Sequence, residues 1–140
     1  MLLHLLVGWT LMGTCVVIHA AGIIAALHRV RGRHPHGFWP QTWLLARLAG
    51  WMVFLHLVEI SVWGLFYAAI GAIGDLTSAL YFSSVTYTTT GYGDVVLPLA
   101  WRLVGGIEAM TGILMFGWST GFFFAVFSRL VVSAPDTGDR

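Results

Sequence analysis

Charged residues are scarce in this chain: Asp, Glu, Lys and Arg make up 9% of its 140 residues, whereas 58% are hydrophobic. Such a composition would not keep a soluble domain of this size dispersed in water, so we expect the lipid bilayer to be its solvent. The formal net charge of +1 gives no indication of nucleic-acid binding. Cysteine is limited to Cys15, which lies in an apolar run, so a disulfide framework within the chain is excluded.

Catalytic motifs are lacking as well. The sequence has no phosphate-binding loop and no pairing of a nucleophile with a base, so we expect neither an enzyme nor a cofactor. Three histidines, His28, His34 and His36, lie in a loop with no cysteine or carboxylate nearby. We interpret them as solvated linker residues and not as a metal site.

Three apolar stretches are long enough to cross about 30 Å of hydrocarbon, which takes roughly 20 helical residues. They run approximately over residues 2–27, 48–70 and 103–128. The first lacks the positive start and the short apolar run of a signal peptide, so we predict a retained helix. Arginines gather before residue 48 and after the third span, which predicts an outside N-terminus and a cytoplasmic C-terminus.

The segment between the second and third spans is apolar but too short to cross the membrane and return as two helices. We therefore expect it to be re-entrant. Asp75 is a plausible N-cap for a helix from Leu76 to Tyr87, because its carboxylate can accept free amides of the first turn. Twelve residues rise about 18 Å, which reaches roughly to mid-bilayer.

The chain must then leave the membrane through non-helical backbone, over residues 88–94. Such backbone is tolerated only inside protein or along an aqueous path. Gly91 and Gly93 can adopt positive φ, so successive carbonyls can turn to one side as a ladder for cations. The hydroxyl of Thr89 can add an oxygen, and the preceding helix points its negative end the same way. One chain covers only one side of an ion, so we expect a cyclic homo-oligomer.

Residues 88–94, TTTGYGD, resemble the signature of potassium channels, in which four such loops surround the pore. The resemblance implies ion sites formed by the Thr89 hydroxyl and by main-chain carbonyls. The carbonyls are those of Thr89, Thr90, Gly91 and Tyr92, with Gly93 and Asp94 closing the outer mouth.

The resemblance also has departures. Many family members have valine at the position of Thr90; that side chain faces away from the ions, so selectivity should survive while filter rigidity is in question. Some bacterial relatives carry glutamate at Val85, behind the filter. Many carry a tryptophan at Tyr81, so Tyr81 would supply a substitute bond to Asp94, or else belong to an interfacial aromatic belt.

Residues 108–129, EAMTGILMFGWSTGFFFAVFSR, resemble the inner helix of bacterial inward-rectifier potassium channels. The resemblance implies a pore constriction at Phe124, although this side chain could equally face lipid. Gly112 matches a bending point, with Gly121 adding flexibility, or else serves close helix packing. Phe116 stands where strongly rectifying relatives carry an acidic residue, so polyamine block should be weak.

Two carboxyl groups, those of Glu59 and Glu108, lie inside spans, where a charge costs about 2.5 to 3.5 kcal/mol unless paired. Both could share the space behind the filter. Hydrogen bonds to Thr86 or Thr88, a pH-sensing role, or an ordinary buried hydrogen bond all remain open. The histidines inside spans, at positions 4, 19 and 56, are interpreted as hydrogen-bonded packing residues.

Together these features predict an all-α membrane protein with three transmembrane helices, a re-entrant pore helix and a filter loop, assembled as a homotetramer. We divide the chain into a peripheral helix (1–28), a cytoplasmic linker (29–43), a pore domain (44–132) and a cytoplasmic tail (133–140). The expected function is passive potassium conduction across a cell membrane, as in a bacterial inner membrane, with K+ as the permeant ion. Alternatives are a weakly selective cation channel, a potassium-transporter subunit and a non-conducting scaffold.

Overall fold

A computed structural model describes residues 1–32, 35 and 37–132, the side chains of residues 131 and 132 excepted. The elements in chain order are α1 (Leu2–Val30), α2 (Phe38–Ala69), α3 (Leu76–Tyr87), the 3-10 helix η1 (Leu99–Trp101) and α4 (Arg102–Val132). The described residues contain helices and no strands. The predicted tail, and the linker histidines His34 and His36, lie outside the described residues.

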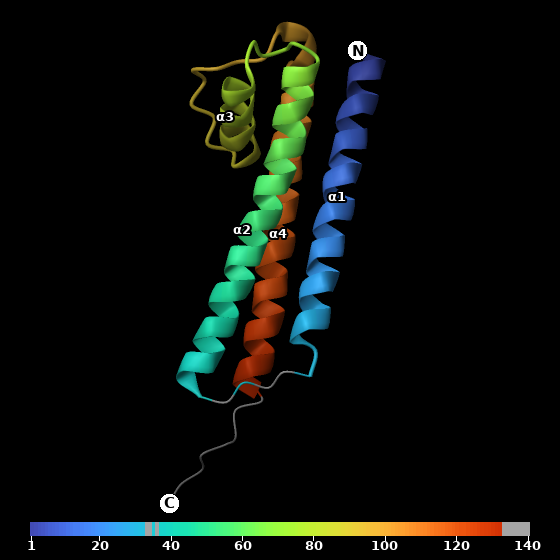
Figure 1. The fold of residues 1–140 in the computed structure, drawn as a ribbon. Coiled ribbons are helices and arrows are strands. Elements are labelled where there is room, and N and C mark those ends of the chain that lie inside the picture. Colours follow the sequence, from blue (N-terminus) through green and yellow to red (C-terminus); the bar gives the residue numbers. More distant parts are fainter. Residues whose placement is uncertain (33–34, 36, 133–140) are drawn as a thin grey trace, which may run out of the picture.

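Three long helices, α1, α2 and α4, run side by side through the length of the molecule, with the N-terminus and the end of α4 at opposite ends (Figure 1). Each of them is long and apolar enough to cross a membrane. The three spans expected from the sequence are thus confirmed as helices. The helices extend beyond the predicted apolar stretches: α1 has 29 residues, α2 has 32 and α4 has 31.

The second helix begins at Phe38, well before the predicted start at residue 48. Gly37, with φ of +94°, ends the loop, and Pro40 is then the third residue of the helix. A proline is tolerated there because amides of the first turn have no carbonyl partner within the helix. The helix therefore includes residues 38–43, which the sequence analysis assigned to the linker.

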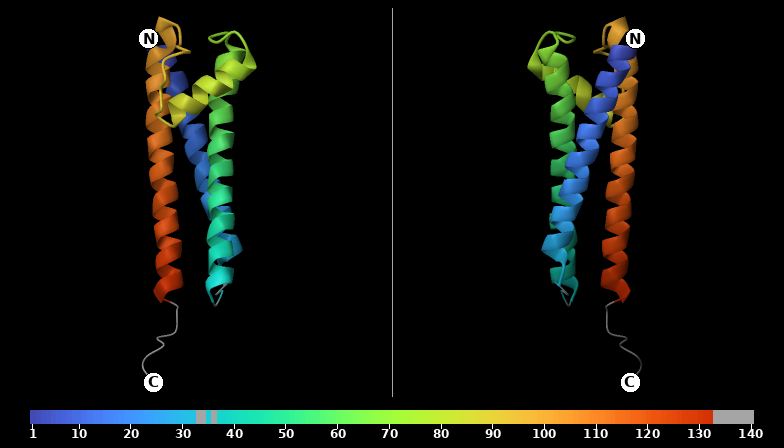
Figure 2. Two further views of the ribbon diagram at one scale, coloured as in Figure 1. Left: turned by 90° about the vertical axis from the view of Figure 1, so that its left-hand side faces the viewer. Right: turned by 90° about the vertical axis from the view of Figure 1, so that its right-hand side faces the viewer.

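The short helix α3 leans between α2 and α4 at the end of the molecule that holds the N-terminus (Figure 2). Its predicted bounds and its predicted cap are confirmed: the Ser78 amide donates to the Asp75 carboxylate at 2.9 Å. This hydrogen bond with the backbone lowers the pKa of Asp75. The chain runs down through α3 and returns through residues 88–98 to the same end (Figure 1).

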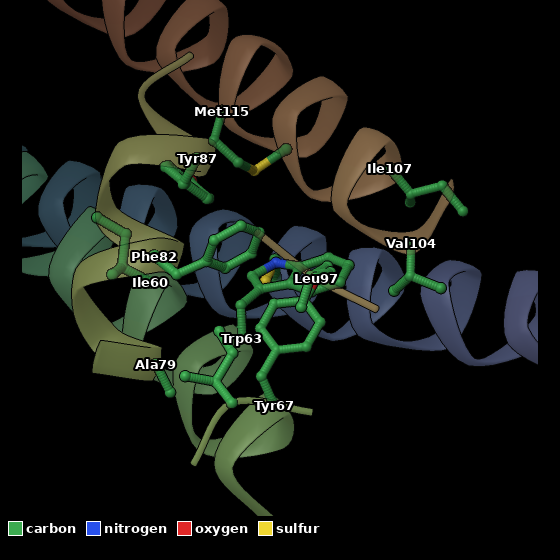
Figure 3. Close-up of a cluster of buried hydrophobic side chains, with 12 residues drawn as sticks. Ile60, Trp63, Tyr67, Ala79, Phe82, Tyr87, Leu97, Val104, Ile107 and Met115 are labelled. Atoms are coloured by element: carbon green, nitrogen blue, oxygen red, sulfur yellow. The ribbon is translucent and has the colours of Figure 1, made fainter. Parts of the chain in front are cut away.

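The main core lies where α3 meets the long helices. Trp63 and Tyr67 of α2 are fully buried there, against Phe82 and Tyr87 of α3 (Figure 3). Its α4 members are Val104, Ile107 and Met115. A second cluster, at the far end, joins α1, α2 and α4 through Ala26, Leu48, Met52, Leu55, Phe122 and Val126. The α3 helix is therefore held at one end of a bundle that is packed along its whole length.

Glycines let α1 approach both of its neighbours. A Cβ atom on Gly8 would lie 2.6 Å from Ile107 of α4, and one on Gly22 would lie 2.4 Å from Leu55 of α2. Close helix approach over small residues is a main source of association in membranes, where burying apolar surface gives little gain. The α1 helix thus docks on α2 and α4; its peripheral position in an assembly stays a prediction.

Candidate functional site

Residues 88–94 follow directly on the end of α3 and have an unusual backbone. Thr89, Gly91 and Gly93 have φ angles of +59°, +53° and +77°. The two glycines were expected to adopt such angles, but Thr89 was not. Positive φ in a β-branched residue is a genuine outlier that costs about 1 to 3 kcal/mol and is concentrated at functional sites. No sequence signal marks this threonine apart from its place two residues before Gly91.

Hydrogen bonds show which way this segment faces. The amides of Thr89 and Gly91 donate back to carbonyls of α3, those of Thr86 and Val85, both at 2.9 Å. Within the described residues, no hydrogen bond is made to the carbonyls of residues 89–93. All of residues 88–94 are exposed in the single chain. The amide side therefore faces α3, and the carbonyl oxygens are left without partners.

Two of the three threonine side chains of this segment, those of Thr88 and Thr90, make local hydrogen-bonding contacts. The Thr88 hydroxyl donates to the Ser84 carbonyl at 2.7 Å and lies 3.0 Å from the Thr90 hydroxyl. The predicted hydrogen bonds from a buried carboxyl to Thr86 or Thr88 are not formed, because Thr88 is already engaged and both carboxyls find other surroundings. Thr86 contributes its carbonyl and not its hydroxyl.

The contact between Tyr81 and Asp94 joins α3 to the outer end of the segment. The Tyr81 hydroxyl donates to the Asp94 carboxylate at 2.7 Å, so the first of the two interpretations of Tyr81 is the one that the structure contains. This hydrogen bond lowers the pKa of Asp94 and raises the pKa of Tyr81. The start and the end of residues 88–94 are thereby both attached to α3.

Gly112 of α4 lies directly against the end of α3. A Cβ atom at Gly112 would stand 1.9 Å from the carbonyl oxygen of Tyr87. The two backbones therefore touch at the residue that precedes the TTTGYGD segment. Of the two interpretations of Gly112, this contact supports close packing; bending at Gly112 stays a prediction.

The remaining α4 candidates lie at different depths. Phe116 is partly exposed and packs on His56, with ring centroids 4.3 Å apart, and on Tyr87. Gly121 is exposed. Among the three successive phenylalanines, Phe122 is buried at 7% exposure, whereas Phe124 is 73% exposed in the single chain. Phe124 is thus the one of these side chains that is most open to a neighbouring subunit, a pore or lipid.

The two buried carboxyls differ in their hydrogen bonds. Glu59 accepts a hydrogen bond from Tyr87 and lies 2.9 Å from the His19 ring. Glu108 is also fully buried, but neither of its oxygens has a hydrogen-bond partner among the described residues. Its polar neighbours are the hydroxyls of Ser83 and Tyr67, which are themselves unpartnered.

The histidines inside the spans behave in two ways. His19 and His56 are hydrogen-bonded packing residues, as expected. The ring of His4 packs instead on Trp101, and its buried Nδ1 has no partner among the described residues. Sequence reasoning missed that His19 and His56 both turn toward Glu59. The only available signal was that all three are ionisable residues inside apolar spans.

Comparison with known proteins finds one matching family model and one similar protein. A family model described as "Ion channel" matches residues 53–129, which is more than half of the chain. The Potassium voltage-gated channel protein Shal of Drosophila melanogaster is 31% identical over 88 residues, which cover 58% of this chain and 15% of that protein. The chain therefore spans a small fraction of that relative's length. No solved structure matches.

Proposed function

Because the chain belongs to the ion channel family, whose model matches residues 53–129, we propose that it is one subunit of a potassium-selective channel. In this proposal α3 is the pore helix and residues 88–94 form the selectivity filter. A potassium ion gives up its water and is held by the Thr89 hydroxyl and by successive carbonyl oxygens. It then passes down its electrochemical gradient without any chemical step.

A single observation carries the proposal. Positive φ recurs at every second residue from 89 to 93, while the amides of Thr89 and Gly91 are bonded to α3. This arrangement leaves a row of carbonyl oxygens without donor partners among the described residues. Unpartnered carbonyls at membrane depth would cost several kcal/mol each unless something replaces the missing donors. Dehydrated cations are suited to that role, and the similarity to Shal favours potassium.

The same geometry supports a cyclic assembly, and we propose a homotetramer as in potassium channels. One chain offers oxygens on one side only, whereas a dehydrated ion needs them all round. Cyclic symmetry lets identical segments meet on an axis. The wholly exposed residues 88–94, and exposed Phe124 on α4, would then face that axis. Four copies would complete the filter, and a ring of Phe124 side chains would close the pore by dewetting.

The proposed orientation rests on the arginines. Arg29, Arg31 and Arg129 lie at the C-terminal ends of α1 and α4, and Arg47 lies in the first third of α2. These ends of the helices lie opposite α3 (Figure 1). Arg102 is at the α3 end. By the positive-inside rule the arginine-rich end is cytoplasmic, which sets the filter near the outer face of a cell membrane.

The decisive experiment is reconstitution into liposomes with a potassium flux assay, with and without barium. We expect barium-sensitive potassium flux and a reversal potential that follows the potassium gradient in mixed sodium and potassium. Equal permeation of sodium and potassium would favour the weakly selective alternative. A complete lack of flux in sealed vesicles would refute conduction. Native mass spectrometry of the detergent-solubilised protein tests the predicted four-subunit assembly.

Two glycines provide a matched pair of variants. Gly91 and Gly71 both have positive φ, +53° and +67°, and a Cβ atom on either would meet nothing within 4 Å. Replacing either by alanine thus imposes a similar backbone strain of about 1 kcal/mol or more. Only Gly91→Ala is expected to abolish selective potassium flux. If Gly71→Ala has the same effect, the loss reflects folding, and the proposed filter loses its support.

A further inference from the structure

Five buried polar side chains from all four helices meet in the middle of the bundle. They are His19 of α1, His56 and Glu59 of α2, Tyr87 of α3 and Ser119 of α4. None is more than 8% exposed. The family model begins at residue 53, so α1, with His19, lies outside the matched residues.

These side chains form a closed ring of hydrogen bonds. His19 Nδ1 lies 2.9 Å from Glu59 Oε1, and His19 Nε2 lies 3.2 Å from Ser119 Oγ. The same Ser119 oxygen lies 3.1 Å from His56 Nε2, and His56 Nδ1 lies 3.3 Å from the Tyr87 hydroxyl. Tyr87 closes the ring by donating to Glu59 Oε2. Each of the four ring nitrogens and both carboxylate oxygens takes part.

A count of hydrogens shows what this ring requires. Its five bonds need five hydrogens, whichever way round each bond points. Tyr87, Ser119 and two neutral histidines supply one each, which makes four. The fifth must sit on Glu59, or be a second proton on a histidine. The complete ring therefore holds one proton more than an ionised Glu59 with two neutral histidines, and it is then electrically neutral.

The surroundings favour the neutral, complete ring. The other titratable side chains that act on it electrostatically are Cys15 of α1 and Glu108 of α4. Among the described residues, the charge contacts of Glu59 are with the two histidines and with no arginine. A net negative charge left here would have no cation to balance it, and an unpaired charge inside a membrane costs about 2.5 to 3.5 kcal/mol.

We propose that this ring links α1 to the end of α3 and thereby positions the pore helix, and that its hydrogen bonds are complete only when it holds the extra proton. We call this link the tether. Tyr87 is the last residue of α3 and directly precedes the TTTGYGD segment. His19 holds one side of Glu59 while Tyr87 holds the other, so α1 acts on the filter as a positioning element without touching it. The inference rests on the proposed function, since it assigns the ring's effect to conduction.

The variant Glu59→Gln should keep the ring of hydrogen bonds complete without the extra proton. Its amide donates permanently to His19 and its carbonyl accepts from Tyr87, so all five hydrogens are present at every pH. The variants His19→Leu and Tyr87→Phe each remove a member and open the ring. Tyr67→Phe is the matched control, because it removes a buried phenol hydroxyl that lies outside the ring, beside Glu108.

The test measures the unfolding temperature in detergent and the potassium flux in liposomes from about pH 6 to about pH 10. In the unaltered protein we expect both to fall as the pH rises and the ring proton is lost. Glu59→Gln should retain its unfolding temperature and its potassium flux at all pH values. The unfolding temperatures of His19→Leu and Tyr87→Phe should be lower by about 4 °C or more at every pH, and should not fall further as the pH rises. Tyr67→Phe should match the unaltered protein.

Several outcomes would overturn the tether. One is a Glu59→Gln variant that keeps the original pH dependence, and another is a Tyr87→Phe variant as stable as Tyr67→Phe. The ligand atoms of His19, His56 and Glu59 all lie within 4.8 Å of one another. If a chelator lowers the unfolding temperature and zinc restores it, these residues hold a metal and not a proton. If no variant conducts but the unfolding temperatures follow the expected pattern, the tether stands and the proposed function fails.

Discussion

Replacing Gly112 by alanine should separate α4 from the end of α3. The new Cβ atom would stand 1.9 Å from the Tyr87 carbonyl oxygen and 2.8 Å from its carbon. Ordinary contact begins at 3.4 Å, so the two backbones must move apart by about 1.5 Å (3.4 minus 1.9). No side chain can turn away to relieve the clash, because the obstacle is main chain at a fully buried position.

The magnitude follows from two opposing terms. Overpacking of a well-filled site costs about 1 to 3 kcal/mol and occasionally more, and a main-chain obstacle belongs at the upper end. Alanine in place of glycine inside a helix stabilises the folded state by about 1 kcal/mol through its higher helix propensity. We therefore expect a net loss of about 2 kcal/mol in the free energy of unfolding, together with a larger loss of potassium flux, because residue 87 adjoins the filter.

Gly106→Ala is the control for this prediction. It lies on the same helix, and a Cβ atom there would meet nothing within 4 Å. The helix-propensity gain should then appear alone, as a slightly higher unfolding temperature with normal flux. The reasoning is refuted if Gly112→Ala is as stable as Gly106→Ala in thermal unfolding followed by size-exclusion chromatography.

Three further variants test separate parts of the site. Tyr81→Phe should lower stability at pH 7, because its hydroxyl bonds the Asp94 carboxylate and lowers the pKa of that group. The difference should shrink as the pH falls below about 4, through the folded-state pKa of Asp94, and thermal unfolding at pH 7 and at a series of lower pH values would detect it. Glu108→Gln should unfold no lower than the original protein, because neither carboxyl oxygen has a partner to lose; a fall of several degrees would contradict this. Phe124→Ala should raise resting potassium flux with little change in stability, whereas buried Phe122→Ala should cost about 3 to 5 kcal/mol of folding free energy; equal stability losses would count against both assignments.

The sequence was most informative where one local rule acts alone. Span positions followed from apolar length, and the bounds of α3 followed from the Asp75 cap and the glycines beyond it. The start of α2 was misjudged because Pro40 signals a break in most contexts yet is harmless in a first helical turn. These elements depend on neighbouring residues along the chain, so a single sequence carries the necessary information.

Contacts between distant segments were much harder to predict. Nothing in the sequence pairs His19 with Glu59, forty residues away, or sets Ser119 between two histidines. The backbone of Thr89 was missed for a similar reason: a threonine adopts positive φ only when surrounding contacts impose it, here the amide bonds from Thr89 and Gly91 back to α3. Such features follow from packing, which local propensities do not encode.

The position of α1 shows how the two kinds of information combine. In a bilayer its apolar surface gains little by leaving lipid, so apolar length alone predicts a helix but no partner. The partner is selected by shape at Gly8 and Gly22 and by polarity at His19. Gly8, His19 and Gly22 lie on one face of the helix, so shape and polarity select the same rotation. Together they set the rotation of α1, and with it the side of the channel subunit on which α1 docks.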